Sequence, residues 1–427
     1  MSSEKATRPG PSPRPGRAPV ATEATATGAT RRLATAAVVL AAVNLRPAVT
    51  SLGPVLAEAR AGLGMSAAVA GLLTSVPAAC FALVGVLAPR LARRYGAAGV
   101  IAAGTALVTV GLAVRPFAGS TAPFLLLSAL ALAGIAVVNV LLPAVVKQRF
   151  PERVGAMTGL YSMALNLGAA GAAGLTVPAT HALGGDWRLG LAVWAALAVV
   201  AVPPWVALLR ARPGTAGADG STGAAAGTVP AGAAPVADSR ITAHPVAWAL
   251  AVYFGLQATA AYVIMGWLPQ IFRDAGLPAE TAGLLFAVTS LLGVPLSFAL
   301  PAVAGRLRDQ SGLAVVLGCF GLAGYAGLYF APAAAPWLWA VLIGVANCSF
   351  PLALTMIGLR GRDTATVVRL SAFAQSAGYL LSIPGPVLVG VLYQHTGGWR
   401  LPLLLVSVLM LGQIVAGRLA GRDRQIG

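Results

Sequence analysis

Twelve long apolar runs follow one another along the chain, each bounded by clusters of Pro, Gly and Arg. A bilayer core about 30 Å thick needs about 20 apolar residues of helix to cross it, and each run reaches that length within the error of its bounds. The pattern therefore predicts an all-α membrane protein with twelve transmembrane helices. We expect these helices at 33–57, 66–89, 97–115, 122–146, 154–179, 187–209, 246–271, 279–304, 312–331, 335–358, 366–392 and 399–419.

Two stretches of the chain lack this apolar pattern. The segment before the first run is rich in Pro, Ala, Thr and Arg and has no apolar core of a signal peptide, which predicts a disordered tail. The segment between the sixth and seventh runs is rich in Gly, Ala, Thr and Pro, as linkers are. We expect a basic cytoplasmic tail at 1–32, a six-helix bundle at 33–210, a cytoplasmic linker at 211–243, a second six-helix bundle at 244–420 and a cytoplasmic tail at 421–427.

The two halves share short sequence motifs at corresponding positions. Asn139 and Pro143 in the fourth run recur as Asn347 and Pro351 in the tenth, with the same spacing. A Pro-x-x-Ala-x-Arg motif follows both the second and the eighth run. Because six spans separate each pair, the halves have the same orientation and are related by an axis along the membrane normal, as in major facilitator transporters. This arrangement predicts a substrate site between the two pseudo-symmetric bundles, near the middle of the membrane.

The composition and the distribution of charge agree with a membrane protein. Hydrophobic residues make up 58% of the chain and charged residues only 10%, which is too apolar for a water-facing globule. The net charge of +17 could indicate a nucleic-acid partner, but the basic residues lie almost entirely between the apolar runs. Of the 29 Lys and Arg residues, 23 fall on one side of the predicted topology. The positive-inside rule then places both termini in the cytoplasm, in a multi-pass protein of the cytoplasmic membrane that binds no nucleic acid.

Five stretches carry a family resemblance: Asn44–Pro47, Thr50–Pro54, Pro143–Phe150, Tyr253–Leu256 and Trp267–Pro269. They resemble the cyanate and nitroimidazole transporter family of the major facilitator superfamily, and the resemblance extends from about residue 33 to 420. The resemblance implies a transporter of cyanate-like anions or nitroimidazole-like heterocycles. The loop after the second run departs from the superfamily's signature, because Pro89 replaces a glycine and Arg93 an aspartate.

Arg46 lies near the middle of the first predicted span. An arginine at this depth costs roughly 2.5–3.5 kcal/mol on insertion scales, so it should face a wet cavity or a partner. All twelve acidic residues fall in tails, loops or helix ends, and none lies deep enough to neutralise it. We interpret Arg46 as the binding charge for an anion; the alternative is a structural arginine bonded to the carbonyls of a neighbouring helix. Pro47 should loosen the helix at this point.

Other polar side chains recur at the middle of the predicted spans. They would line a central cavity and offer hydrogen bonds to a small polar solute, with an aromatic wall beside them. The alternative for each amide is hydrogen bonding between helices, which contributes about 0.6 kcal/mol in membranes. The predicted substrate-binding residues besides Arg46 are Asn44, Asn139, Asn166, Gln257, Tyr262, Asn347 and Gln375.

The sequence predicts a transporter rather than an enzyme. It contains no paired carboxylates, metal-ligating cluster or activated nucleophile at membrane depth, so we expect no catalytic residue, no metal and no cofactor. We expect a secondary active or facilitative transporter whose partners are a small anionic or polar substrate and the lipid bilayer. The sequence does not decide whether protons are the coupling ion. If they are, Glu58 or the substrate itself would carry them. The alternative function is multidrug or metabolite efflux of hydrophobic compounds, with a larger apolar pocket and little dependence on Arg46.

Overall fold

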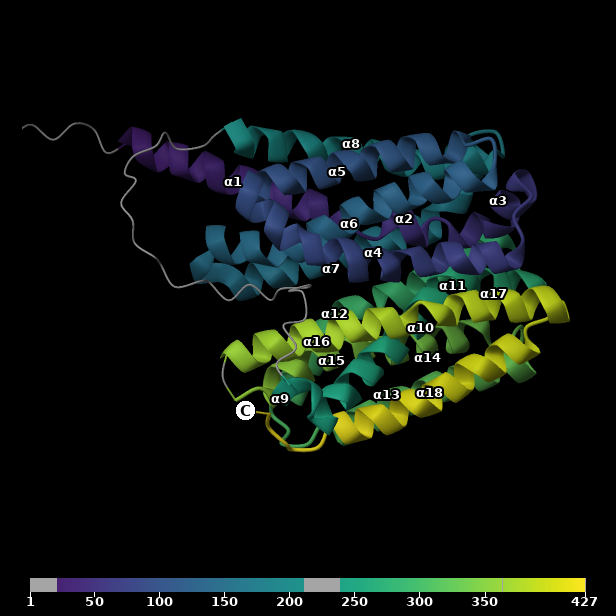
Figure 1. Cartoon of the computed structure of the whole chain (residues 1–427). Coiled ribbons are helices and arrows are strands. Elements are labelled where there is room, and N and C mark those ends of the chain that lie inside the picture. Colours follow the sequence, from purple (N-terminus) through teal and green to yellow (C-terminus); the bar gives the residue numbers. More distant parts are fainter. Residues whose placement is uncertain (1–20, 211–238, 363, 427) are drawn as a thin grey trace, which may run out of the picture.

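The computed structural model describes residues 21–210, 239–362 and 364–426, and these are helical almost throughout (Figure 1). The first half contains α1 (Ala21–Val43), α2 (Pro47–Thr50), α3 (Leu56–Leu63), α4 (Ala67–Tyr95), α5 (Ala97–Val114), α6 (Thr121–Arg149), α7 (Val154–Ala182) and α8 (Trp187–Arg210). The second half contains α10 (Pro245–Asp274), α11 (Ala279–Leu291), α12 (Gly293–Ala304), α13 (Ser311–Phe330), α14 (Pro336–Asn347), α15 (Ser349–Arg360), α16 (Thr364–Ser382), α17 (Pro384–Thr396) and α18 (Arg400–Ala420), preceded by the short α9 (Ser239–Thr242).

The predicted fold class is confirmed. The described residues contain 12 helical spans that are long and apolar enough to cross a bilayer. From the second span to the twelfth, the bounds differ from the prediction by a few residues. The first span is longer than predicted, because the chain continues through a short 3-10 helix (Gly53–Val55) into α3 and ends at Leu63.

The predicted disordered tail needs one correction. Its residues 1–20 lie outside the described part of the chain, but α1 begins at Ala21, well before Leu33. Pro19 is the last proline before α1. The segment that follows it is rich in alanine, which has the highest helix propensity of all residues. The predicted linker lies outside the described residues over 211–238, and α9 and the residues before α10 occupy the rest of it.

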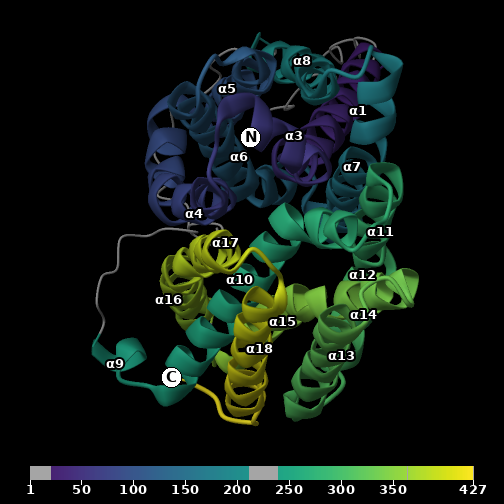
Figure 2. The ribbon, with the colours of Figure 1, turned by 90° about the vertical axis from the view of Figure 1, so that its right-hand side faces the viewer.

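The helices form two bundles that pack side by side (Figures 1 and 2). Two helix pairs make the closest contacts between them: α4 with α17, and α7 with α11. Glycines allow this approach. A Cβ atom on Gly71 would lie 2.5 Å from the carbonyl oxygen of Pro386, and one on Gly283 would lie 2.7 Å from that of Ala173. Such small residues let helix backbones approach closely in membranes.

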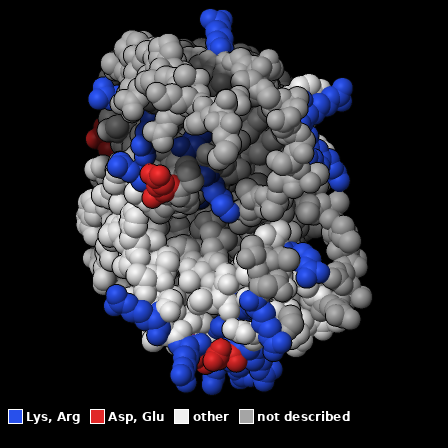
Figure 3. Space-filling model, turned by 90° about the vertical axis from the view of Figure 1, so that its left-hand side faces the viewer, with Lys and Arg blue, Asp and Glu red and all other residues white. Residues whose placement is uncertain are grey.

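The molecule has two ends, which we call the termini side and the far side. The termini side carries the start of α1 and the end of α18, and the far side carries α3 and the end of α17 (Figure 1). Figure 3 shows that the termini side is hollowed near its centre and that Lys and Arg side chains gather on this face. At the far side the halves are joined instead, for example by a hydrogen bond of 3.0 Å from the Ala68 N–H to Oε1 of Gln394.

Several spans are interrupted near prolines. The first is broken between Val43 and Pro47, the eighth at Leu292 and the tenth at Cys348. Proline lacks the N–H that a helix requires and clashes with the preceding turn, so the helix breaks or bends there. The break in the first span confirms the prediction made from Pro47, and it leaves Arg46 outside regular helix.

Candidate substrate site

Arg46 lies in the break between α1 and α2, with φ −116° and ψ −31°. Its side chain is half-buried, and its Nη1 approaches the Sδ atom of Met265 in α10 at 3.8 Å. A thioether is a weak acceptor and cannot neutralise a guanidinium. None of the ion pairs between described residues includes Arg46. The charge therefore reaches from the first half to the second half and meets no carboxylate there.

Two tyrosines of the second half lie near this charge. The Arg46 guanidinium is close enough to interact electrostatically with Tyr262 in α10 and with Tyr379 in α16. The ring of Tyr379 stacks on Phe81 of α4 with centroids 5.2 Å apart and an interplanar angle of 16°. We call Arg46, Phe81, Tyr262, Met265 and Tyr379 the Arg46 site. Its members come from both halves, as expected for a site between the bundles.

The break that carries Arg46 is held against α7 by a glycine. Because Pro47 has no N–H, it cannot donate to the carbonyl of Val43 one turn earlier. Gly168 packs against this carbonyl so closely that a Cβ atom on the glycine would lie 2.0 Å from the oxygen. The absence of a side chain at Gly168 therefore allows α7 to support the break directly beneath Arg46.

The predicted amides of the first half lie in different surroundings. Asn44 is buried and donates to the carbonyls of Leu40 at 2.8 Å and Leu197 at 3.2 Å, so it bonds α1 to α8 within the first half. Asn166 donates to the carbonyl of Ser162 at 3.1 Å and packs against Gly293 of α12, which places it between the halves. Of the two, Asn166 has the position that a substrate site between the bundles requires.

The predicted amides of the second half form a network. Gln257 donates from Nε2 to the backbone oxygen of Asn347 at 3.0 Å and to its Oδ1 at 2.9 Å, and it accepts from Gln413 at 3.1 Å. Pro351 explains why the Asn347 carbonyl is available, since it has no N–H to donate to that oxygen. The network bonds α10, α14 and α18 to each other. This is the interhelical hydrogen bonding that the sequence left open as the alternative.

Two predicted residues, Asn139 and Gln375, are half-buried. None of the described hydrogen bonds joins either of them to another helix. Gln375 donates to Oγ of Ser371 at 2.7 Å within α16. Asn139 in α6 is also half-buried. Neither is brought to Arg46 by a described contact, so both stay predictions as substrate ligands. Phe81, Met265 and Tyr379 were not predictable from the sequence, because apolar and aromatic residues are common throughout the spans and carry no distinguishing pattern.

The sequence of this chain matches a known family of membrane transporters over most of its length. The model of the Major Facilitator Superfamily matches residues 38–383. The chain belongs to this family. It is 34% identical to the 2-nitroimidazole transporter of Escherichia coli (strain K12) over 403 residues, covering 93% of this chain and 98% of the relative. It is 29% identical to the cyanate transport protein CynX of the same organism over 378 residues, covering 88% and 94% of the two chains.

A solved structure shares the fold. It is a bacterial homolog of the human lysosomal transporter Spinster, with a TM-score of 0.72, a sequence identity of 15% and coverage of 93% of this chain and 98% of that chain. The protein is thus a multi-pass transporter of the major facilitator superfamily and not an enzyme.

An ion pair joins the two halves of this facilitator at the far side. Arg273 of α10 binds Glu58 of α3 in a bidentate manner, with Nη2 to Oε1 at 2.6 Å and Nη1 to Oε2 at 2.9 Å. The same Nη1 donates to the carbonyl of Pro54 at 3.1 Å. A second, more exposed pair links His181 of α7 to Glu280 of α11 at 2.9 Å. Both pairs join the two halves, so opening of the far side would require both to separate.

We expect Glu58→Gln to shift the facilitator toward states open at the far side. The Arg273 and Glu58 side chains are 21% and 39% exposed, so their pairing stabilises the closed far side by about 1 kcal/mol at most, roughly fivefold in population. Pulsed EPR between spin labels at Ala61 and His395 should show more of the longer distances. Glu280→Gln, which removes the more exposed pair, is the control and should shift the distances less. Unchanged distances in Glu58→Gln would show that this pair does not hold the far side closed.

Proposed function

We propose that this facilitator moves a small anion or polar heterocycle, cyanate-like or nitroimidazole-like, by alternating access, with Arg46 as the central binding charge. The observation that carries the proposal is the position of Arg46. Its half-buried guanidinium lies between the halves, contacts a thioether, acts electrostatically on two tyrosines and forms no ion pair with any described carboxylate. Burying a charge without a partner is costly, so a negative or electron-rich ligand would stabilise it. The names of the two relatives agree with such ligands.

The aromatic residues suit this class of substrate. The stacked pair of Phe81 and Tyr379 presents flat apolar surface beside the guanidinium, and Tyr262 contributes a phenol that can donate or accept a hydrogen bond. A flat heterocycle bearing a nitro group, or a short linear anion, could use the charge and the rings together. A large hydrophobic compound would use the rings but would gain nothing from Arg46.

We also propose that the termini side faces the cytoplasm, in the cytoplasmic membrane. Of the 29 Lys and Arg residues, 23 belong to the segments assigned to this side, and basic residues gather on this face in Figure 3. The hollow on this face and the contacts that join the halves at the far side then correspond to a state open to the cytoplasm. Protons could couple to transport in this scheme through Glu58, because protonation would weaken its pairing with Arg273.

Uptake into proteoliposomes tests the substrate class. The panel should contain cyanate, other small monovalent anions, 2-nitroimidazole, unsubstituted imidazole and a large hydrophobic cation, each offered to liposomes with and without the protein. We expect transport of at least one small anion or nitro-substituted azole and none of the hydrophobic cation. Transport of the hydrophobic cation alone would contradict the proposal and favour drug efflux.

A further inference from the structure

A second arginine is buried in the first half. Arg115 lies just after α5, in a 3-10 helix (Arg115–Phe117), and its side chain is only 1% exposed. From the sequence, Arg115 stands at the end of the predicted span 97–115. Its Nη1 donates to the carbonyl of Ala48 at 2.8 Å, and its guanidinium lies 6.0 Å from the ring centroid of Phe124. Neither contact supplies a negative charge.

Most of the hydrogen-bonding capacity of this guanidinium is unused. Among the described residues, Nε and Nη2 of Arg115 have no hydrogen-bond partner, and no ion pair includes Arg115. The hydroxyl of Ser128 in α6 is fully buried and likewise has no partner in the described part of the chain. Unpaired buried polar atoms are rare in folded proteins, and an unpaired buried charge is costlier still.

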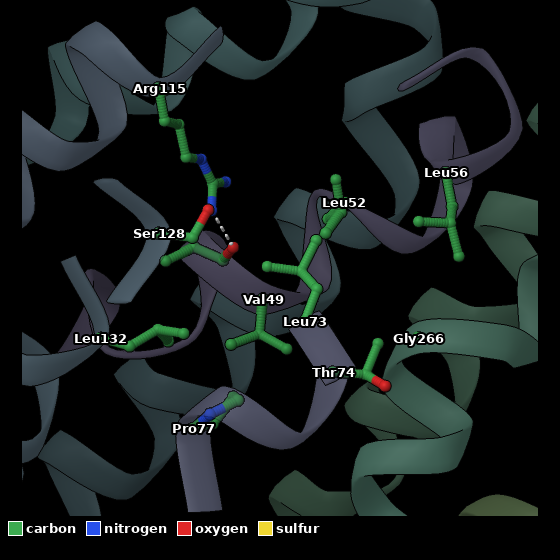
Figure 4. A pocket seen from close by; sticks show the side chains of 11 residues that line it. Val49, Leu52, Leu56, Leu73, Thr74, Pro77, Arg115, Ser128, Leu132 and Gly266 are labelled. Carbon is green, nitrogen blue, oxygen red and sulfur yellow. Dashed lines mark hydrogen bonds between the residues drawn. The ribbon is translucent and has the colours of Figure 1, made fainter. Parts of the chain in front are cut away.

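These unpaired groups line the same cavity. Arg115 and Ser128 form its polar side, with their polar ends directed toward one another, and Val49, Leu52 and Leu132 form much of its apolar side (Figure 4). The cavity has room for about one water molecule. Only a very small ligand fits without displacement of the surrounding side chains.

We propose that Arg115 and Ser128 form a buried binding site for a halide-sized monovalent anion, separate from the Arg46 site. A water molecule could accept hydrogen bonds from the guanidinium, but it would leave the positive charge unbalanced. A monovalent anion accepts hydrogen bonds from Arg115 and Ser128 and also neutralises the charge, and such charge-assisted bonds are about twice as strong as neutral ones. The apolar lining and the small volume exclude larger anions.

The anion site lies close in the chain to Arg46, the proposed substrate-binding charge. Ala48, whose carbonyl binds Arg115, lies in α2 two residues after Arg46. An anion held by Arg115 would therefore stabilise the short helix that follows the break in the first span. This role does not require the substrate proposed above, because the site would be occupied by an abundant inorganic anion.

Thermal unfolding of the purified protein in detergent tests the site. We expect a higher Tm for the wild type in sodium chloride or bromide than in sodium gluconate at equal ionic strength. This difference should disappear in Arg115→Gln, and Ser128→Ala should require a higher chloride concentration for the same rise. Arg188→Gln removes an arginine from the surface of α8 and should keep the full rise, as should Arg46→Gln. Equal Tm values of the wild type in chloride and gluconate would overturn the proposal.

Two further results separate the alternatives. Loss of the chloride effect in Arg46→Gln, with the effect retained in Ser128→Ala, would place the anion at the Arg46 site and overturn the assignment. If Arg115→Gln does not fold, crystals of the wild type grown in bromide provide the second readout. An anomalous peak beside Arg115 and Ser128 is expected, whereas ordinary water density without anomalous signal there would overturn the proposal.

Discussion

Replacing Arg46 by alanine should slow transport roughly 10- to 100-fold at low substrate concentration while the protein still inserts and folds. The side chain forms no ion pair among the described residues, and its loss removes a costly charge from a span, so stability should not fall. If the guanidinium binds the substrate, its loss removes a charged hydrogen bond worth about 1.5–3 kcal/mol, or roughly 10- to 100-fold in transport rate at low substrate concentration. Initial uptake rates in proteoliposomes measure this effect.

Arg46→Lys should restore transport only in part, because an ammonium group keeps the charge but lacks the planar fork of the guanidinium. Arg188→Ala serves as the matched control. Arg188 lies in α8 near Asp186, away from the space between the halves, and its loss should leave uptake unchanged. Equal uptake by the wild type, Arg46→Ala and Arg46→Lys would remove Arg46 from the transport mechanism.

Gly168→Ala should destabilise the protein and reduce transport. The added Cβ atom would lie 2.0 Å from the carbonyl oxygen of Val43, so α1 and α7 would have to move apart at the break that precedes Arg46. Overpacking of this kind typically costs about 1–3 kcal/mol. We expect a Tm lower by several degrees and a smaller folded yield, measured by fluorescence-detected size-exclusion chromatography after heating.

Gly171→Ala is the control on the same helix. A Cβ atom at Gly171 would meet no described atom within 4 Å, and alanine has the higher helix propensity, so this variant should be as stable as the wild type or more stable. If Gly168→Ala matched Gly171→Ala in Tm and in transport, the close contact between Gly168 and Val43 would be unimportant for the fold and for the support of Arg46.

The fold could be predicted because a bilayer imposes a simple rule. Each span must be apolar over about 20 residues, so its position is visible in the sequence, and the recurrence of Asn139 and Pro143 as Asn347 and Pro351 revealed the two halves. The break near Pro47 was predictable for an equally local reason, since proline removes a backbone donor. These signals need no knowledge of which helices are neighbours.

The composition of the site was less predictable, because it depends on the rotation and packing of each helix. Asn44 and Arg46 are two residues apart, yet Asn44 bonds to α8 while Arg46 reaches α10. Gln257 was predicted to bind the substrate, but the free carbonyl of Asn347 engages it within the second half. Arg115 stands at the end of a span, where the sequence alone cannot distinguish a solvated arginine from one that turns inward.

Equilibrium binding of the substrate to the purified protein tests the role of Arg46 most directly. The ligand is the most rapidly transported compound of the uptake panel, and isothermal titration compares the wild type with Arg46→Gln, a neutral variant that keeps part of the side-chain length. If the guanidinium holds the substrate, the Kd should rise at least about tenfold in the variant. The same Kd in both proteins would contradict the assignment of Arg46 as the binding charge.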